Sequence, residues 1–146
     1  MRCENSILIR APLETIFRTV SDLESWPRLL PHYRWVRVAS RSSQSMTVRM
    51  AARRGWLPIR CTSRYEADAA VPELRFQHLR AFTRGMEVRW SFTPTAEGVL
   101  VRISHDLKRR SALGRWFARR VLGDMFIRPV AARTLQQFKR HLERPA

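Results

Sequence analysis

A long stretch of helical periodicity, residues 111–142, limits most strongly what this chain can fold into. A helix of about 30 residues spans roughly 45 Å at about 1.5 Å per residue, so it needs a broad apolar surface to lie on. Ser111 can cap its start, whereas Pro129 lacks an N–H group and crowds the carbonyl of Met125, which predicts a kink or break. The apolar side chains that recur at helical spacing are Leu113, Trp116, Phe117, Leu122, Phe126, Ala131, Leu135, Phe138 and Leu142.

The residues before this helix mostly follow the two-residue period of strands, so the surface should be a sheet. An amphipathic helix is expected from Pro12 to Val20, and a second helical turn from Leu23 to Trp26. Short turns between the strands imply antiparallel pairing of neighbours. We therefore predict an α+β fold for one domain, residues 1–146, in which a curved seven-stranded antiparallel sheet (β-αα-β6-α) wraps around the C-terminal helix. The expected strands are 3–10, 33–41, 46–50, 56–67, 74–80, 86–92 and 99–107.

The sequence offers no membrane span, no signal peptide and no metal-ligand spacing. We therefore expect a protein of the cytoplasm, or one peripheral to the membrane, that works without metal or cofactor. Cys3 and Cys61 are expected to be reduced thiols with structural roles. A Ser/His/Asp order and a glycine-rich phosphate loop are also missing from the sequence.

The net charge of +16 is unusual, and it comes from 28 basic residues, 26 of them arginine, against 12 acidic ones. Such a charge attracts nucleic acid, the ribosome or an anionic membrane, although a general arginine bias spread over a solvated surface would give the same number. The basic residues concentrate at the start of the long helix. The predicted contacts with an anionic surface are Arg109, Arg110, Arg115, Arg119 and Arg120, next to Lys108.

Three short motifs resemble those of a known family. They are Trp26-Pro27-Arg28-Leu29-Leu30-Pro31-His32-Tyr33, Thr62-Ser63-Arg64 and Arg89-Trp90-Ser91-Phe92. In this order, followed by the terminal helix, they resemble the polyketide cyclase/dehydrase and lipid-transport family of the START-like, helix-grip superfamily, near its coenzyme-Q-binding and aromatase/cyclase branches. The resemblance implies an apolar cavity between sheet and helix for a polyketide, an isoprenoid quinone or a lipid. From the residue pattern alone, a solid core is an equal alternative to a cavity.

The resemblance also implies the residues of a site. Arg64 would polarise a carbonyl, and Tyr33 would relay a proton or hydrogen-bond the ligand. However, Arg64 lies on the opposite strand phase to the apolar residues around it, so it faces either the cavity or solvent. The expected ligand contacts are Trp26, Leu30, Tyr33, Arg64, Met86, Trp90, His105 and Phe126.

The two histidines near these positions have weaker assignments. His32 follows the Pro31 turn and could be an acid or base at the mouth of the pocket. His105 lies on the apolar phase of the last strand, where a core histidine with satisfied hydrogen bonds is favoured over a catalytic one.

Three functions remain open. The first is a carrier or chaperone for a hydrophobic small molecule. The second is a polyketide cyclase/aromatase or dehydrase that uses Arg64, Tyr33 and His32. The third is an RNA- or ribosome-binding regulator, whose affinity should fall steeply with salt.

Overall fold

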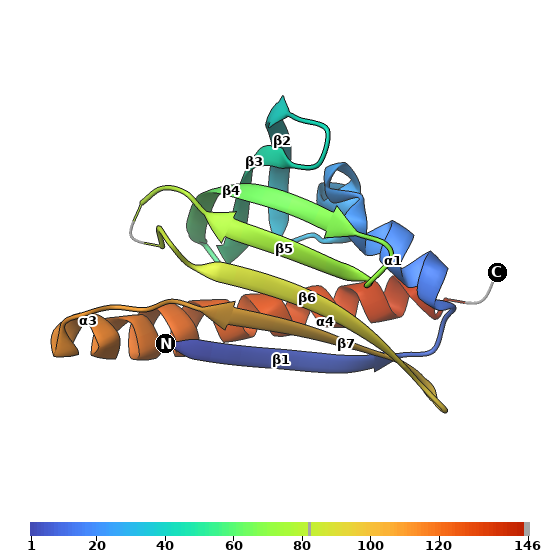
Figure 1. Ribbon diagram of the computed structural model, residues 1–146. Coiled ribbons are helices and arrows are strands. Elements are labelled where there is room, and N and C mark those ends of the chain that lie inside the picture. Colours follow the sequence, from blue (N-terminus) through green and yellow to red (C-terminus); the bar gives the residue numbers. More distant parts are fainter. Residues whose placement is uncertain (82, 145–146) are drawn as a thin grey trace.

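The computed structural model describes residues 1–81 and 83–144, and its centre is a curved sheet (Figure 1). Within these residues seven strands pair antiparallel in the order β1-β7-β6-β5-β4-β3-β2. The predicted α+β helix-grip fold is thereby confirmed. The strands are β1 (Arg2–Ile9), β2 (Tyr33–Arg41), β3 (Met46–Arg54), β4 (Leu57–Asp68), β5 (Glu73–His78), β6 (Glu87–Thr95) and β7 (Gly98–Asp106).

Helices cover one face of this sheet. Between β1 and β2 the chain forms α1 (Leu13–Ser21), the short 3-10 helix η1 (Leu23–Ser25) and α2 (Trp26–Leu29). The C-terminal helical run consists of α3 (Ala112–Phe117), the π-helical η2 (Ala118–Ile127) and α4 (Arg128–Leu142), and it extends along the sheet with α3 at one end (Figure 1). The alternation on β6 shows why the layers form, since Val88, Trp90 and Phe92 are buried while Glu87 and Arg89 are exposed.

The helical run continues through Pro129, so of the expected kink or break the break does not occur. Ile127 and Arg128 keep helical backbone angles, and the residues just before Pro129 are wound as a π-helix. Wider π-turns are a known way for a helix to absorb a local irregularity. Pro129 has no N–H for the carbonyl of Met125, and Arg54 Nη1 at the end of β3 donates a hydrogen bond to that carbonyl instead. At the start, Ser111 caps the helix as expected, because its Oγ accepts a hydrogen bond from the Gly114 N–H at 3.0 Å.

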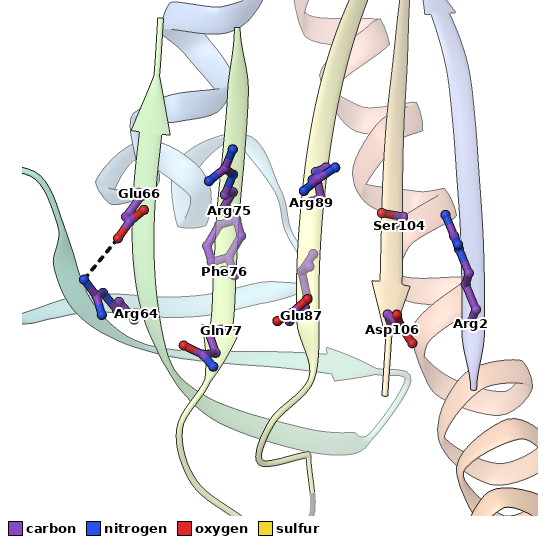
Figure 2. Close-up of a pocket in the computed structure, with 11 residues that line it drawn as sticks. Arg2, Arg64, Glu66, Arg75, Phe76, Gln77, Glu87, Arg89, Ser104 and Asp106 are labelled. Atoms are coloured by element: carbon purple, nitrogen blue, oxygen red, sulfur yellow. Dashed lines mark ion pairs between the residues drawn. The ribbon is translucent and has the colours of Figure 1, made fainter. Parts of the chain in front are cut away.

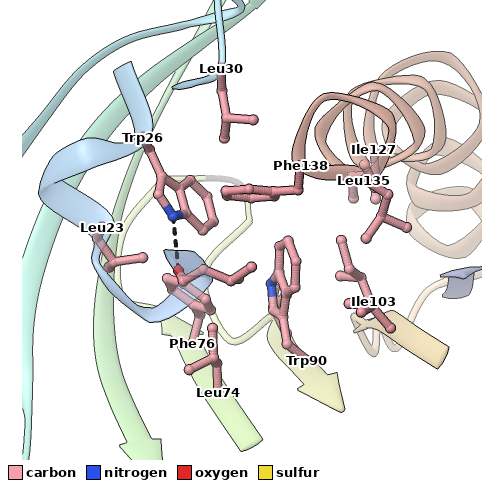
Figure 3. Packing of buried hydrophobic residues seen from close by; sticks show 14 of the residues in the cluster. Leu23, Trp26, Leu30, Leu74, Phe76, Trp90, Ile103, Ile127, Leu135 and Phe138 are labelled. Carbon is pink, nitrogen blue, oxygen red and sulfur yellow. Dashed lines mark hydrogen bonds between the residues drawn. The ribbon is translucent and has the colours of Figure 1, made fainter. Parts of the chain in front are cut away.

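Aromatic rings fill the space between the sheet and α4 near α2 (Figure 3). The ring of Trp26 lies 5.8 Å from that of Phe138 and 5.7 Å from that of Trp90, centroid to centroid. The Trp26 indole Nε1–H donates to the Val20 carbonyl at 2.9 Å, so this buried polar atom is satisfied. This cluster makes one end of the space under the helix a solid core.

Candidate functional site

A cavity of about 110 Å³ remains between the inner face of the sheet and the C-terminal helices. The sequence left a solid core and a cavity as alternatives, and the structure contains both. The residues that border the cavity are mostly apolar. They are Trp26, Tyr33, Met50, Ala52, Ile59, Arg60, Cys61, Ser63, Phe76, His78, Thr83, Met86, Val88, Trp90, Ile103, His105, Leu122, Phe126, Ile127, Val130, Ala131 and Thr134.

One end of this cavity is aromatic. Trp26, Tyr33, Phe76 and Trp90 border it, and the Tyr33 ring meets the Trp26 ring edge-on with 5.1 Å between centroids. Rings arranged in this way present flat apolar walls. This end therefore suits a planar or hydrocarbon part of a ligand.

Polar side chains gather towards the β5–β6 connection. Ser63 on β4 stands opposite His78 on β5, and His78 Nδ1 lies 2.9 Å from Thr83 Oγ1. His105 on β7 borders the same space, and within the described residues its buried Nδ1 and the buried Oγ of Ser63 have no hydrogen-bond partner. A buried polar atom without a partner costs about 1–3 kcal/mol, so these two atoms are suited to bind a polar group of a ligand. We call Ser63, His78, Thr83 and His105 the polar end of the cavity.

The two histidines of the polar end are neutral at pH 7. Burial lowers the pKa of His78 to about 4. Burial and the neighbouring His78 lower the pKa of His105 to about 3. A neutral imidazole has one donor and one acceptor nitrogen, so the polar end offers hydrogen bonds and not charge.

His32 does not lie at the mouth of the cavity, so that prediction is wrong. Its side chain is buried, and its Nε2 is 2.7 Å from Thr134 Oγ1. The Thr134 hydroxyl donates to the Val130 carbonyl at 2.8 Å, so His32 Nε2 is the donor in the contact between the two side chains. Burial lowers the pKa of His32 to about 4, which leaves a neutral histidine that fixes the position of Thr134 in the cavity wall.

Tyr33 and Cys61 border the cavity with protonated side chains. Burial raises the pKa of the Tyr33 hydroxyl above its ordinary value, and it raises the pKa of Cys61 to about 11. The Tyr33 hydroxyl therefore keeps its proton at neutral pH and can donate a hydrogen bond. Cys3 and Cys61 are both free thiols, as expected.

Arg64 points away from the cavity, so the prediction that it faces the ligand is wrong. Its strand neighbours Ser63 and Tyr65 are buried, and a regular pleat then turns Arg64 outward. On the outer face Arg64 Nη2 pairs with Glu66 Oε1 at 3.2 Å, with more than half of the arginine side chain exposed. Arg60, also on β4, borders the cavity, but it is exposed and shares the strand phase of Arg64.

Replacing Arg64 should therefore have little effect. We expect Arg64→Ala to change the free energy of unfolding by less than about 0.5 kcal/mol, because an exposed ion pair contributes little. Urea unfolding followed by circular dichroism measures this. Tyr65→Ala is the contrasting variant, because it removes a buried ring whose hydroxyl donates to the Ser21 carbonyl at 2.8 Å. A loss above about 1.5 kcal/mol in Arg64→Ala would contradict the outward orientation.

The other predicted contacts divide into two groups. Trp26, Met86, Trp90, His105 and Phe126 all border the cavity with Tyr33, and their contact with a ligand stays a prediction. Leu30 is fully buried but belongs to the core around Trp26 and not to the cavity lining. Sequence reasoning missed Ser63, His78 and Thr83, although Ser63 alternates with Cys61 and Tyr65 on the inner phase of its strand.

A larger hollow lies on the outer face of the sheet, and Figure 2 shows its lining. Its volume is about 460 Å³, but charged side chains surround it, among them Arg2, Arg75, Arg89, Glu87 and Asp106. Hydrated charged side chains contribute little free energy to the binding of a small ligand. Sites for small ligands are instead mostly apolar, with a few placed polar groups. The internal cavity is therefore the candidate site.

Two further observations concern the described residues. They contain no group of three or more His, Cys, Asp and Glu side chains that could hold a metal ion. Among the same residues, no helix has the length and hydrophobicity needed to cross a membrane.

Comparison with known proteins supports a common architecture. Residues 1–143 match the family described as polyketide cyclase/dehydrase and lipid transport. A protein of Streptomyces halstedii named "Putative polyketide cyclase" is 30% identical over 105 residues, which cover 68% of this chain and 94% of that protein. Among solved structures, the Zhui aromatase/cyclase of Streptomyces sp. R1128 superimposes with a TM-score of 0.82 at 16% identity, covering 99% of this chain and 94% of that one. A protein of Thermus thermophilus superimposes with a TM-score of 0.81 at 19% identity, covering 97% of both chains.

Proposed function

Because this chain belongs to the polyketide cyclase/dehydrase and lipid transport family, we propose that it is a carrier or chaperone for a small hydrophobic molecule. The ligand class we propose is a ring or short chain with one hydroxyl or carbonyl group, such as the head of a quinone, a phenolic polyketide or a lipid. The ligand would lie in the cavity between the sheet and the C-terminal helices.

The observation that carries this proposal is the pair of unsatisfied polar atoms in a mostly apolar cavity. Ser63 Oγ and His105 Nδ1 are buried without a partner in the described part of the chain. A hydroxyl or carbonyl oxygen of a ligand would supply the missing hydrogen bonds, while its apolar part replaces empty space against Trp26 and Trp90. A wholly apolar ligand would leave both atoms unsatisfied.

The volume of the cavity limits the size of the buried part. At about 110 Å³ it is well below the 300–1,000 Å³ of sites that enclose a drug-sized molecule. We therefore propose that one ring or a short chain is enclosed, and that any longer tail leaves between β4 and the C-terminal helix. Ile59, Arg60 and Cys61 of β4 and Phe126 and Val130 of the helix are the partly or fully exposed lining residues on these two sides.

The experiment uses two probes that differ in one hydroxyl group, 4-propylphenol and propylbenzene, titrated calorimetrically into the protein. One satisfied hydrogen bond of about 1.4 kcal/mol should make 4-propylphenol bind about tenfold more tightly. Ser63→Ala combined with His105→Phe should remove that preference while propylbenzene still binds. Arg64→Ala is the control that should keep it, because Arg64 lies on the outer face.

Two results would overturn the proposal. One is equal affinity of the wild-type protein for both probes, which would leave the polar end without a role. The other is no binding of either probe, together with native mass spectra of the purified protein that contain no hydrophobic adduct.

A second candidate function is a polyketide cyclase/aromatase or dehydrase. The observation that favours it is the Tyr33 hydroxyl in the cavity wall, which could donate a hydrogen bond to a substrate carbonyl as that oxygen gains negative charge during cyclisation. In this alternative no arginine takes the role that the sequence had assigned to Arg64, because Arg60 and Arg64 share the outer phase of β4. A changed product distribution from a nascent polyketide with Tyr33→Phe, but not with Arg64→Ala, would favour catalysis over transport.

A further inference from the structure

Exposed apolar side chains gather at one end of the molecule. Of the eight large hydrophobic residues that are exposed in the described part of the chain, seven come from three neighbouring segments, and Val71 is the exception. The segments are the β3–β4 turn with the start of β4, the β5–β6 connection, and α3 with η2. We call the seven residues the apolar rim: Trp56, Leu57, Leu79, Leu113, Trp116, Phe117 and Met125.

Hydrogen bonds hold these three segments together. Arg54 at the end of β3 donates to the Met125 carbonyl of η2. Arg109, which precedes α3, donates to the Arg84 carbonyl of the β5–β6 connection at 3.5 Å. Figure 1 shows α3 and the β5–β6 connection at the same end of the sheet. The rim residues therefore gather at one end of the molecule, although they come from distant parts of the chain.

The same segments carry a strong positive charge. Residues 53–60, 79–84 and 108–125 hold eleven basic residues and one acidic residue, Asp124. Asp124 Oδ1 lies 3.3 Å from Arg128 Nε, so this acidic group is itself paired with an arginine. The basic residues are Arg53, Arg54, Arg60, Arg80, Arg84, Lys108, Arg109, Arg110, Arg115, Arg119 and Arg120.

The chemistry of the exposed apolar side chains distinguishes a lipid bilayer from a nucleic acid as the partner. Trp56 is 89% exposed on a turn, and Leu113 is 76% exposed on α3, a helix without a buried residue. Four residues of the rim have no aromatic face on which a nucleic-acid base could stack, namely Leu57, Leu79, Leu113 and Met125. The hydrocarbon of a lipid bilayer accommodates aliphatic and aromatic side chains alike. It does so without a surface of complementary shape. Arginines beside them suit the phosphates of lipid headgroups, and tryptophan favours the membrane interface.

We propose that the apolar rim and its arginines dock this protein on an anionic lipid bilayer. The rim surrounds the side on which Ile59, Arg60 and Phe126 border the cavity, so docking places the ligand route at the membrane surface. Only the purpose of the docking, which is to bring the ligand route to the membrane, rests on the proposed carrier function. The docking itself needs no ligand.

Vesicle flotation with the ligand-free protein tests the proposal. At 100 mM salt we expect binding to vesicles of phosphatidylcholine with 30% phosphatidylglycerol, and at least tenfold weaker binding to pure phosphatidylcholine. Trp56→Ser with Leu113→Ser should weaken binding at least tenfold, as should Arg119→Glu with Arg120→Glu. The matched controls are Val71→Ser and Arg102→Glu, which alter an exposed apolar and an exposed basic residue outside the rim segments, and both should bind like the wild type.

Several outcomes would overturn it. Equal losses in the rim variants and the controls would mean that total charge and not this surface causes binding. Absence of vesicle binding, with steeply salt-dependent binding to RNA, would assign the surface to nucleic acid, and binding only to an acidic protein would assign it to a protein partner. The probe titrations with 4-propylphenol contain no lipid, so the ligand proposal and the docking proposal can fail separately.

Discussion

Acidification from pH 7 to pH 5 should destabilise the protein by about 2 kcal/mol for each of three histidines, the buried His32 and the half-buried His78 and His105. In the folded state the pKa is about 4 for His32 and His78 and about 3 for His105, against 6.5 for an unperturbed side chain. The unfolded chain therefore binds more protons than the folded chain below pH 6.5, and the free energy of unfolding falls as pH falls towards 4. Above pH 6.5 these histidines are mostly neutral in both the folded and the unfolded state, so their protonation no longer lowers the free energy of unfolding. Losses of this size are a large fraction of a typical total of about 5–15 kcal/mol.

Urea unfolding at half-unit steps between pH 7 and pH 5 measures this slope. His141→Gln is the control and should leave the slope unchanged, because that side chain is exposed on α4. His105→Gln should reduce the slope by about one third, whatever it does to stability at pH 7. A free energy of unfolding that stays constant from pH 7 to pH 5 would mean that the three histidines are protonated without cost, and would contradict their burial.

Phe138→Ala should destabilise the protein by about 3–5 kcal/mol, which is the usual cost of removing a large buried aromatic side chain. Phe138 is completely buried, and its ring lies 5.8 Å from Trp26 and 6.1 Å from Trp90. These contacts join α4 to α2 and to the sheet at once, so the loss weakens the attachment of the terminal helix. Chemical denaturation at pH 7 gives the change in the free energy of unfolding.

Two further variants calibrate this measurement. Phe138→Leu keeps most of the volume and should cost less than about 1.5 kcal/mol. Leu113→Ala, on the exposed face of α3, should change stability by less than about 0.5 kcal/mol. A cost below about 1 kcal/mol for Phe138→Ala would mean that the sheet does not hold α4 through this aromatic cluster.

The fold was predictable because burial repeats regularly along the chain. The alternation of Val88, Trp90 and Phe92 with charged residues identifies β6 and its inner face without any structure. Tyr33–Arg41 was predicted with the bounds that β2 has. The π-helix before Pro129 was not predictable, because periodicity over a few residues cannot distinguish a widened turn from a kink.

The site was predictable only in part. The aromatic contacts follow from strand phase and from the motif around Trp26. The motif also pointed to Arg64 as the cation of the pocket, but the phase of β4 decides its orientation, since the buried Ser63 and Tyr65 leave Arg64 on the outer face. Phase placed His105 on the inner face correctly, but the expectation that its hydrogen bonds are satisfied is wrong, because Nδ1 has no partner among the described residues. However, its unsatisfied Nδ1 depends on neighbours from other strands, and a linear sequence does not contain that information.

The hydrogen bond from Arg54 to the Met125 carbonyl has a mechanical consequence. It joins the end of β3 to the C-terminal helix, and it is a side-chain contact outside the backbone ladders of sheet and helix. Because the contact is exposed, breaking it costs about 1 kcal/mol or less, and no strand has to change its register. A ligand that enters between β4 and the helix, as proposed above, would therefore not require the sheet to unfold.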